Sequence, residues 1–396
     1  MTNRSRGWEA LRYRDFRLLW SAEVISMAGS QLMRTALAWQ IFELTRDPLQ
    51  LGLLGLSRFV PLLIFGLWGG VIADRGDRRM TLIQSQAVLA GLSLVLAGLT
   101  ITGRITPAWI YGVTMAAAAV GAIGSPTRQA LIPALVPRDL LAGAMTMNSL
   151  AYQIGAVAGP ALGGVLLATI GVGPIYAFDA LTFLVVIAAA VAMRARPELP
   201  TSRQGGVAAI REGLRFLWAT PILLGVMGLD FLATFWGQSN VLMPIFASDI
   251  LGGGPRTLGL LLSAPAAGSL AGSAVLAAIR IPHRPGLGVL GAVAAYGLCT
   301  IGFGLSDSLP VALLFLAGGG AADAASMAMR HTVRTMVTPD DLRGRIAAAH
   351  STFAMGGPQL GEFEAGLVAS WVGASAAVSI GGAGVVLSTV LVAWLV

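Results

Sequence analysis

Apolar segments long enough to cross a membrane alternate with short polar segments along almost the whole chain. An α-helix needs about 20 mostly apolar residues to span a bilayer. Twelve segments meet this requirement, near residues 16–42, 51–73, 80–101, 107–128, 140–169, 174–193, 220–248, 256–279, 287–305, 309–331, 341–369 and 373–396. The first is too long for the apolar region of a signal peptide. The pattern therefore predicts an all-α membrane protein with twelve transmembrane helices.

Arginines mark alternate loops between these segments. Of the 26 basic residues, 21 lie in the N-terminal tail and in the loops at 74–79, 128–138, 194–215, 280–284 and 330–345. The intervening loops hold only Arg46, Arg104 and Arg256. Loops on the cytoplasmic side of a membrane carry an excess of basic residues. The pattern therefore predicts that both termini are cytoplasmic.

Residues 125–171 recur 202 positions later in the chain. The shared positions are turn residues, charges and glycines rather than scattered leucines, which indicates two related halves. They pair Arg128 with Arg330, Pro137 with Pro339, Asp139 with Asp341, Leu140 with Leu342, Ser149 with Ser351, Gly155 with Gly357, Gly159 with Gly361, Gly164 with Gly366 and Gly171 with Gly373. An even number of predicted helices in each half gives both halves the same orientation. We expect a six-helix bundle at 1–193, a linker at 194–219 and a second six-helix bundle at 220–396.

The composition excludes several classes of protein. With a mean hydropathy of +0.77, 56% hydrophobic and 11% charged residues, the chain is too apolar to be soluble. The net charge of +7 is confined to short loops and forms no contiguous basic face, so no nucleic-acid partner is expected. The absence of lysine excludes a Walker A loop and Schiff-base chemistry.

The chain also offers little for metal or cofactor binding. Cys299 is the single cysteine, so an intrachain disulfide and a cysteine metal cluster are excluded. His283, His331 and His350 form no HExxH motif. We expect no metal, no cofactor and no enzymatic activity.

The segment 194–219 connects the two predicted bundles. Prolines and glycines break its first part, and an apolar stripe at Val207, Ile210, Leu214 and Leu217 follows, with Arg211 beside it. The stripe fits a basic amphipathic helix in the cytoplasmic membrane interface. An ordinary linker helix packed on the protein fits it equally well.

A charged turn, Gly69 to Arg79, follows the second apolar segment, although so short a turn needs no such cluster for solubility. It resembles motif A of the major facilitator superfamily, whose glycine, aspartate and paired arginines match Gly70, Asp74, Arg78 and Arg79. Asp77 departs from the general motif, which has glycine there. The D-R-x-D-R-R spacing instead resembles the enterobactin-exporter and macrolide-efflux branch.

The resemblance implies roles for these residues. In that family the motif latches the two halves on the cytoplasmic side when the cavity opens outward. Asp74 would be the latch, and Arg75, Arg78 and Arg79 would pair with cytoplasmic helix ends. We assign Asp77, Arg128 and Arg330 to the same gate. The simpler alternative is that these charges only determine membrane topology.

The fifth segment carries glycines at helical spacing. Gly155, Gly159 and Gly163 fall on one face and permit close helix contact, and Pro160 favours a bend there. With Gly164 they match motif C of the superfamily, GxxxGPxxGG, which is associated with antiporters. Tight packing alone is the alternative. The second half diverges, with its proline moved to Pro358 and Glu362 at the position of Pro160.

Ionisable side chains inside the predicted helices each require an explanation, because a charge in mid-membrane costs about 2.5–3.5 kcal/mol on insertion scales. These residues are Glu23, Arg34, Arg58, Asp179, Asp230, Asp323, Glu362 and Glu364. Any one of them can be a carrier or a charge satisfied by a neighbouring helix. Glu362 and Glu364 point in different directions on their helix, so at most one faces a central cavity.

Two polar stripes are candidates for a proton or substrate site. Glu23, Ser30 and Arg34 lie near one line on the first helix, although Glu23 and Arg34 are too far apart to pair. The seventh helix offers a second stripe with Asp230, Trp236, Gln238 and Asn240. By the resemblance, both stripes face the central cavity. Arg58 and Glu362 are further candidates for this site.

Asp323 and Arg330 form one more candidate group. They are seven residues apart and therefore share a helix face. This placement is compatible with the cytoplasmic gate as well as with the proton or substrate site.

Together these features predict a monomeric secondary transporter of the bacterial inner membrane with the major facilitator fold. By the resemblance it exports small amphipathic compounds, drugs or siderophore-like molecules, by proton antiport with alternating access. Its partners are then a small-molecule substrate, protons and the lipid bilayer. A lipid or lysolipid translocator of the same fold and a non-transporting membrane sensor are the alternatives.

Overall fold

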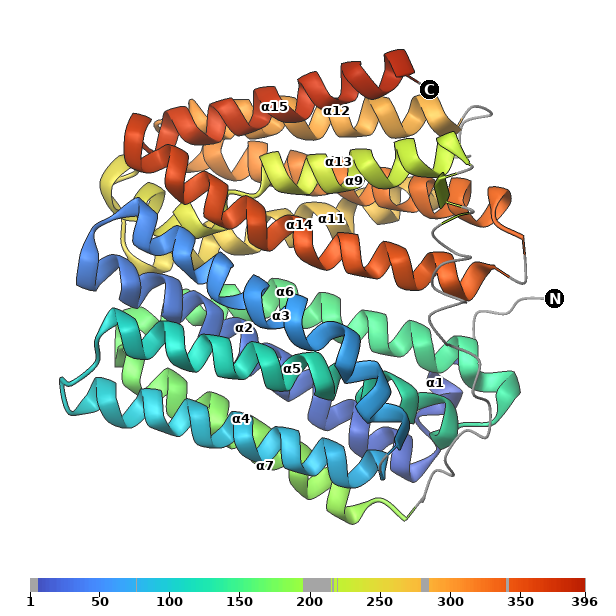
Figure 1. The fold of residues 1–396 in the computed structure, drawn as a ribbon. Coiled ribbons are helices and arrows are strands. Elements are labelled where there is room, and N and C mark those ends of the chain that lie inside the picture. The colour runs from blue at the N-terminus through green and yellow to red at the C-terminus, as the bar shows by residue number, and fades with distance from the viewer. Residues whose placement is uncertain are drawn as a thin grey trace. The chain divides into compact units, whose positions relative to one another are not determined.

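The computed structural model describes residues 6–75, 77–194, 215, 217–218, 220–278, 285–339 and 342–395, and all regular elements in these residues are helical (Figure 1). Side chains are not described at 6–7, 66–75, 126, 130, 285, 343–345, 347–349, 351–353, 355 and 395. The elements are α1 (Arg6–Ala10), α2 (Arg14–Thr45), α3 (Pro48–Arg75), α4 (Arg78–Ile101), α5 (Pro107–Leu135), η1 (Arg138–Leu140), α6 (Leu141–Ile170), α7 (Val172–Ala192), α9 (Pro221–Gly237), η2 (Asn240–Leu242), α10 (Met243–Ile245), η3 (Phe246–Ile250), α11 (Pro255–Ala278), α12 (Pro285–Gly304), α13 (Leu309–Val337), α14 (Arg343–Val372) and α15 (Ala374–Leu395).

Ten helical segments of the described chain are long and apolar enough to cross a membrane. The two other long helices, α2 and α14, have 32 and 30 residues but more polar sequences. Length alone would let both span a bilayer. The fold class is therefore confirmed, whereas a count of twelve spans stays a prediction for these two helices. The predicted linker helix lies almost wholly outside the described residues.

The chain divides into two compact units. Unit 1 comprises Met1–Thr45 and Ser57–Thr201, and unit 2 comprises Arg46–Leu56 and Ser202–Val396. The first turns of α3 thus group with unit 2, where Gly52 lies against Gly366 of α14. The glycines permit this approach because a Cβ on Gly52 would stand only 3.0 Å from the Gly366 Cα.

The two units repeat one packing scheme. In unit 1, α2 packs on α6 and α7, and α4 packs on α5 and α7. In unit 2, α9 packs on α14 and α15, and α12 packs on α13 and α15. The bounds of α13 and α14 lie 202 positions after those of α5 and α6. The sequence repeat therefore corresponds to a repeat of helix neighbours.

Proline and glycine set several helix ends at corresponding places in the two units. Pro107 begins α5, where its missing N–H would have no intrahelical partner. Gly171 ends α6 with φ of 77°, and Gly373 ends α14 with φ of 86°. Such left-handed conformations suit glycine, which has no Cβ.

The predicted span 220–248 is interrupted. The helix α9 ends at Gly237, and the chain continues through a 3-10 turn, the short helix α10 and a π-helical turn. Pro244 contributes to the interruption because it has no N–H for a continuous helix. The Tyr296 hydroxyl donates to the carbonyl of Gly237 at the end of α9, at 2.9 Å.

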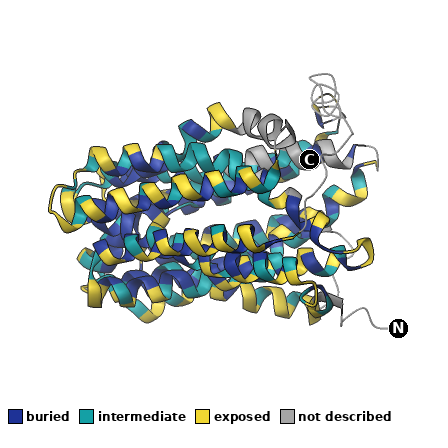
Figure 2. Cartoon of the chain, turned by 90° about the horizontal axis from the view of Figure 1, so that it is seen from below, coloured by how far each residue is buried: buried dark blue, intermediate teal, exposed yellow. Residues whose placement is uncertain are grey.

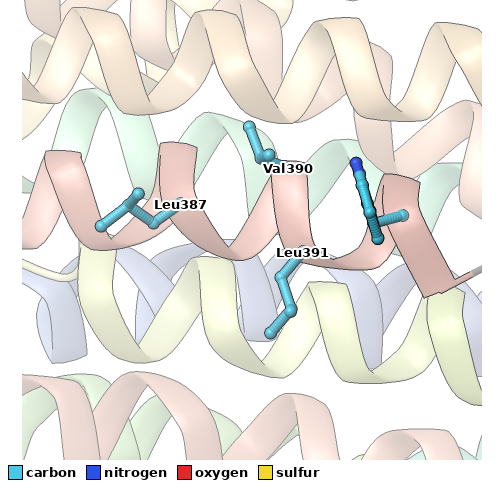
Figure 3. A pocket seen from close by; sticks show the side chains of 4 residues that line it. Leu387, Val390 and Leu391 are labelled. Carbon is cyan, nitrogen blue, oxygen red and sulfur yellow. The ribbon is translucent and has the colours of Figure 1, made fainter.

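Large apolar side chains cover the outer sides of the helices. Figure 2 shows exposed positions along the whole length of the helices, and Trp394 of α15 is 90% exposed. Figure 3 shows a shallow hollow on α15 lined by Leu387, Val390, Leu391 and Trp394. An exposed surface of this composition is expected where the surrounding solvent is lipid.

Candidate functional site

A buried ion pair joins α2 and α5 in unit 1. Glu23 is 2% exposed, on the α2 face that also buries Leu19 and Ala22. The Arg128 Nε lies 3.5 Å from the Glu23 Oε1. A carboxylate removed from water requires a counter-charge, and Arg128 supplies it from the end of α5.

A second pair joins α9 and α13 in unit 2. Asp230 and Arg330 form an ion pair, and both side chains are almost completely buried. Arg330 also contacts Asp323, which lies seven residues earlier on the same face of α13. Its Nη2 is 3.3 Å from the Asp323 Oδ1. The seven-residue spacing of these two residues predicts their shared face. The contact of Arg330 with Asp230 is not predictable from local spacing, because the two residues lie on different helices.

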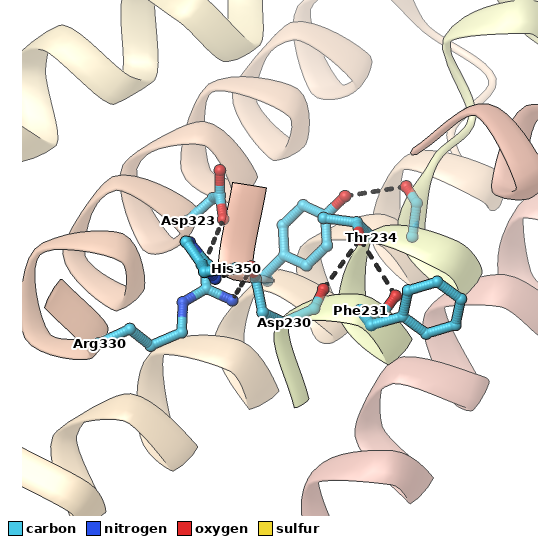
Figure 4. Close-up of polar contacts among 8 residues, drawn as sticks. Asp230, Phe231, Thr234, Asp323, Arg330 and His350 are labelled. Atoms are coloured by element: carbon cyan, nitrogen blue, oxygen red, sulfur yellow. Dashed lines mark hydrogen bonds and ion pairs between the residues drawn. The ribbon is translucent and has the colours of Figure 1, made fainter. Parts of the chain in front are cut away.

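His350 of α14 completes this group. Its Nδ1 lies 3.8 Å from the Asp230 Oδ2, and Figure 4 shows Asp230, Asp323, Arg330 and His350 converging from three helices. We name these four residues the unit 2 cluster. His350 is the member that sequence reasoning missed, although it lies close after the arginine-rich loop of the repeat.

The pairs occupy equivalent positions in the two units. A Cβ built on Gly159 would meet the Gln31 Cβ at 2.5 Å, and one built on Gly361 would meet the Gln238 Cβ at 3.0 Å. Gln31 and Gln238 are 207 positions apart, as are Glu23 and Asp230. Arg128 and Arg330 are equivalent in the 202-position repeat. The acid of the first helix and the arginine of the fourth are therefore paired in both units.

The surroundings of the two pairs differ. In the 202-position repeat, Gly121 of α5 corresponds to Asp323, and Asn148 of α6 corresponds to His350. Unit 1 thus has a neutral residue at both places where unit 2 has a titratable one. Arg334 and His331 of α13 also act electrostatically on His350. The pair in unit 2 therefore has more ionisable neighbours than the pair in unit 1.

The glycines of motif C line the contact between α6 and α2. Gly155, Gly159 and Gly163 are buried, and a Cβ on each would lie within 3.3 Å of an α2 side chain. Pro160 and Gly164 are buried beside them. This geometry permits close packing of α6 on α2, as the spacing of the glycines predicts.

The described part of motif A organises one end of unit 1. Asp77 is the N-cap of α4, because its Oδ1 accepts from the backbone N–H of Arg79 at 2.9 Å and of Met80 at 3.3 Å. The departure from the general motif thus supplies a helix cap. Arg78 is half-buried and has a partner.

The end of α7 receives two arginines from the same region. Arg79 Nη2 donates to the Val191 carbonyl at 2.7 Å, and Arg14 Nη1 donates to the Ala192 carbonyl at 3.1 Å. Carbonyls in the last turn of a helix have no intrahelical partner, and cations are favourable there. The side chains of Gly70, Asp74 and Arg75 lie outside the described residues, so the latch contact stays a prediction.

The members of the predicted polar stripes differ in burial, and the role of either stripe in a proton or substrate site stays a prediction. On α2, Glu23 is buried, Ser30 is half-buried and Arg34 is exposed. In the second stripe, Trp236 lies on α9 with Asp230, whereas Gln238 and Asn240 follow the end of that helix. Their positions differ: Trp236 packs against Gly384 of α15, Gln238 lies by Gly361 of α14, and Asn240 is exposed.

Arg58 and Glu362 are half-buried, and each has an interaction partner. The Glu362 side chain lies by Gly55, where an added Cβ would come within 2.6 Å of it. Among the described residues, no group of three His, Cys, Asp or Glu side chains could hold a metal ion.

Unit 1 contains a further polar network that sequence reasoning did not assemble. The Ser93 hydroxyl of α4 donates to the Asp179 Oδ2 of α7 at 2.8 Å, and both residues are buried. The Tyr176 hydroxyl donates to the Gln40 Oε1 at 2.9 Å. Asp179 was visible in the sequence as an ionisable residue within a span, but its partner is 86 residues away.

Relatives of known activity match most of the chain. A family model described as transmembrane secretion effector matches residues 5–395. The enterobactin exporter EntS of Escherichia coli O6:K15:H31 (strain 536 / UPEC) is 30% identical over 343 residues, which cover 84% of this chain and 79% of that protein. EntS of Shigella boydii serotype 18 (strain CDC 3083-94 / BS512) matches with the same identity and coverage.

Solved structures of transporters share the fold. A bacterial homolog to the human lysosomal transporter Spinster, in an inward-facing and unoccupied conformation, matches with a TM-score of 0.73 and 17% identity over 100% of this chain and 96% of that chain. A bacterial homologue of the iron transporter ferroportin, in an inward-facing state, matches with a TM-score of 0.72 and 17% identity over 96% and 98%. These relatives are transporters and not enzymes.

Proposed function

The chain belongs to the transmembrane secretion effector family of major facilitator transporters, and from this membership we propose that it exports small amphipathic compounds, drugs or siderophore-like molecules. The observation that supports export most directly is the 30% identity to enterobactin exporters along 84% of the chain. Enterobactin is therefore the first compound to test. We place the protein in the bacterial inner membrane as a monomer with both termini cytoplasmic.

Proton antiport is the proposed source of energy. Each unit buries a carboxylate, paired with an arginine, among its helices. Ionisable groups buried among transmembrane helices are typical of proton relays. One proton moved through 100 mV supplies about 2.3 kcal/mol. A tenfold gradient costs about 1.4 kcal/mol, so one proton per neutral substrate sustains a gradient of a few tens-fold.

Alternating access requires a gate that opens and closes. We propose that Asp74 is the latch of the cytoplasmic gate, and that the nearby arginines bind helix ends there. The contacts from Arg79 to Val191 and from Arg14 to Ala192 support a gate built from arginines and helix carbonyls. We assign tight, reversible packing of α6 on α2 to the glycines of motif C.

Export is tested in a bacterial strain that lacks its own efflux pumps. Expression of the protein is expected to lower the intracellular content of enterobactin, and a panel of antibiotics and siderophores then defines the range of substrates. If no compound in the panel is exported and none is less toxic, the export proposal is wrong.

A matched pair of variants tests the latch. Asp74→Asn removes the charge proposed to close the gate, and export is expected to fall to background while the protein still accumulates in the membrane. Asp77→Asn makes the same chemical change at the cap of α4, where asparagine caps about as well as aspartate, and export is expected to persist. Full export by Asp74→Asn would contradict the latch.

Proton coupling is tested with purified protein in liposomes. Transport of the substrate found in cells is expected to accelerate when a proton gradient is imposed, and the lumen is expected to change pH as substrate moves. Equal rates with and without the gradient would exclude antiport but leave export standing.

A further inference from the structure

The unit 2 cluster is the place where one arginine serves two carboxylates. Arg330 pairs with Asp230 and, at 3.3 Å, with Asp323. Asp230 in turn faces the His350 Nδ1 at 3.8 Å. One Asp230 oxygen therefore pairs with a fixed positive charge, and the other lies near a titratable imidazole (Figure 4).

The charges in this region balance when the imidazoles are neutral. Asp230 and Asp323 carry two negative charges, and Arg330 and Arg334 carry two positive ones. An additional proton therefore gives this region one net positive charge. That gain is tolerable only if a guanidinium keeps a carboxylate partner, and Asp323 is such a partner for Arg330.

We propose that Asp230 and His350 form a proton-binding site in unit 2, and that Arg330 is held by Asp323 alone while the proton is bound. This inference rests on the proposed proton antiport and names the site that performs it. The proton comes from water on one side of the membrane, binds to the His350 Nδ1 or the Asp230 Oδ2, and returns to water on the other side. Only N–H or O–H bonds to this proton form and break.

All ionisable groups described around His350 enter the argument. Asp230 faces it from α9, and Arg330, Arg334 and His331 act on it from α13. Asp323, also on α13, acts through Arg330. Tyr296 of α12 is within electrostatic range of Asp323 and Arg330. The helix α15, which also packs on α14, contains no ionisable side chain.

Unit 1 provides the internal comparison for this site. Its equivalent pair, Glu23 and Arg128, has Gly121 and Asn148 where unit 2 has Asp323 and His350. Neither residue binds a proton near neutral pH, and neither offers Arg128 a second carboxylate. The pair in unit 1 thus joins α2 to α5, but it has no second carboxylate to hold Arg128 and no histidine to bind a proton beside Glu23.

Histidine NMR on the purified full-length protein tests the site without any substrate. The chain has three histidines, so the resonances are assigned by replacing His283, His331 and His350 in turn with glutamine. The titration midpoint of His350 is expected to shift by about 1 pH unit in Asp230→Asn. Glu23→Gln, the matched change in unit 1, is expected to leave it unmoved.

An unchanged His350 midpoint in folded Asp230→Asn would overturn the proposal. Asp230→Glu keeps the charge and serves as the second variant should the asparagine variant fail to fold. Its His350 midpoint is expected to remain within about 0.5 pH unit of the original. A shift as large as that expected for the neutral variant would also overturn the proposal.

Transport in liposomes, with enterobactin as the probe, separates this inference from the proposed function. His350→Asn installs the residue of unit 1 and is expected to lose most of the acceleration by a proton gradient while downhill movement continues. Full acceleration in His350→Asn refutes the site and leaves antiport intact. A third outcome is that the His350 midpoint shifts in Asp230→Asn while transport by the original protein does not respond to a proton gradient. That outcome supports proton binding at the site and contradicts its role in antiport.

Discussion

The two ion pairs that join a first helix to a fourth helix each consist of an acid and an arginine, but their surroundings differ. In unit 1, Glu23 is buried and Arg128 remains 28% exposed along its side chain. In unit 2, Asp230 and Arg330 are 11% and 7% exposed, and Asp323 and His350 extend the group. The two pairs occupy equivalent positions in the repeat, but the pair in unit 2 has more ionisable neighbours.

The comparison also explains why the glycine faces persist in both units. An acid on the first helix reaches an arginine on the fourth only if the first helix is held in place by the fifth. Gly159 against α2 and Gly361 against α9 provide that hold. The packing is thus the shared framework, and the charges around it are where the units have diverged.

Removal of the two arginines is expected to give the largest difference between the units. Arg330→Met leaves two carboxylates without their guanidinium and is expected to cost about 3–5 kcal/mol of stability. Arg128→Met leaves one carboxylate beside a partly exposed position and is expected to cost about 1–2 kcal/mol. Thermal unfolding of both purified variants in one detergent measures the difference. Equal losses of stability would mean that Asp323 and His350 do not change how much the arginine contributes to the stability of its unit.

Alanine in place of the two equivalent glycines tests the framework. A Cβ on Gly361 meets the backbone carbonyls of Phe235 and Thr234, the latter at 2.8 Å, whereas one on Gly159 meets the Gln31 Cβ at 2.5 Å and a backbone carbonyl only at 3.3 Å. Backbone yields less readily, so Gly361→Ala is expected to cost about 2–3 kcal/mol and Gly159→Ala about 1–2 kcal/mol.

Gly163→Ala is the matched control for these two variants. Its nearest neighbours, at 3.3 and 3.4 Å, are side-chain atoms, so its unfolding temperature is expected to change little. Unfolding in the same detergent compares all three variants. A reversed order for Gly361 and Gly159 would show that the α9 contact is looser than the α2 contact.

Neutralisation of Asp323 makes unit 2 more like unit 1. The Asp323 side chain is 44% exposed, so Asp323→Asn is expected to change stability by less than about 1 kcal/mol. Its expected effect is on the titration of His350, because Arg330 loses its alternative partner. Histidine NMR and thermal unfolding on the same sample measure both quantities. A large loss of stability without a change in titration would assign Asp323 a structural role.

The reverse change makes unit 1 more like unit 2, with the smallest expected effect. A Cβ on Gly121 meets no atom within 4 Å, and the position is seven residues before Arg128, the same spacing as in the unit 2 cluster. Gly121→Asp is therefore expected to fold, with a stability within about 1 kcal/mol of the original. Failure to accumulate in the membrane, with Gly121→Ala accumulating normally, would show that Arg128 cannot share its charge.

Local patterns in the sequence predicted much of this molecule. The apolar segments predicted the helices because a spanning helix satisfies its own backbone. The spacing of Asp323 and Arg330 predicted that they share a helix face, because helix geometry repeats every 3.6 residues. The interruption after Gly237 was missed because the residues on both sides of it are apolar enough to be counted as one span, and Pro244 was not weighed against that length. The cap of α4 was assigned to no residue in advance, since capping depends on where the helix begins.

Contacts between distant helices were beyond the reach of such patterns. Glu23 and Arg128 are separated by 105 positions, and Asp230 and His350 by 120. A polar stripe shows that a residue faces something, but several neighbouring helices could provide the partner. Arg34 was grouped with Glu23 because both lie near one line on α2, and that spacing gave no sign that Glu23 is buried against Arg128 of α5.

The sequence by itself determined that this chain is a helical membrane protein with an internal repeat, and its motifs indicated the transporter family. These properties depend on apolar length, periodicity and identical residues, all of which are local or directly countable. The tertiary structure alone decided that Glu23 pairs with Arg128, that Asp230 and Arg330 form the equivalent pair, and that His350 joins only the second. Those partners are set by which helices pack together, and packing depends on side chains that are distant in the sequence.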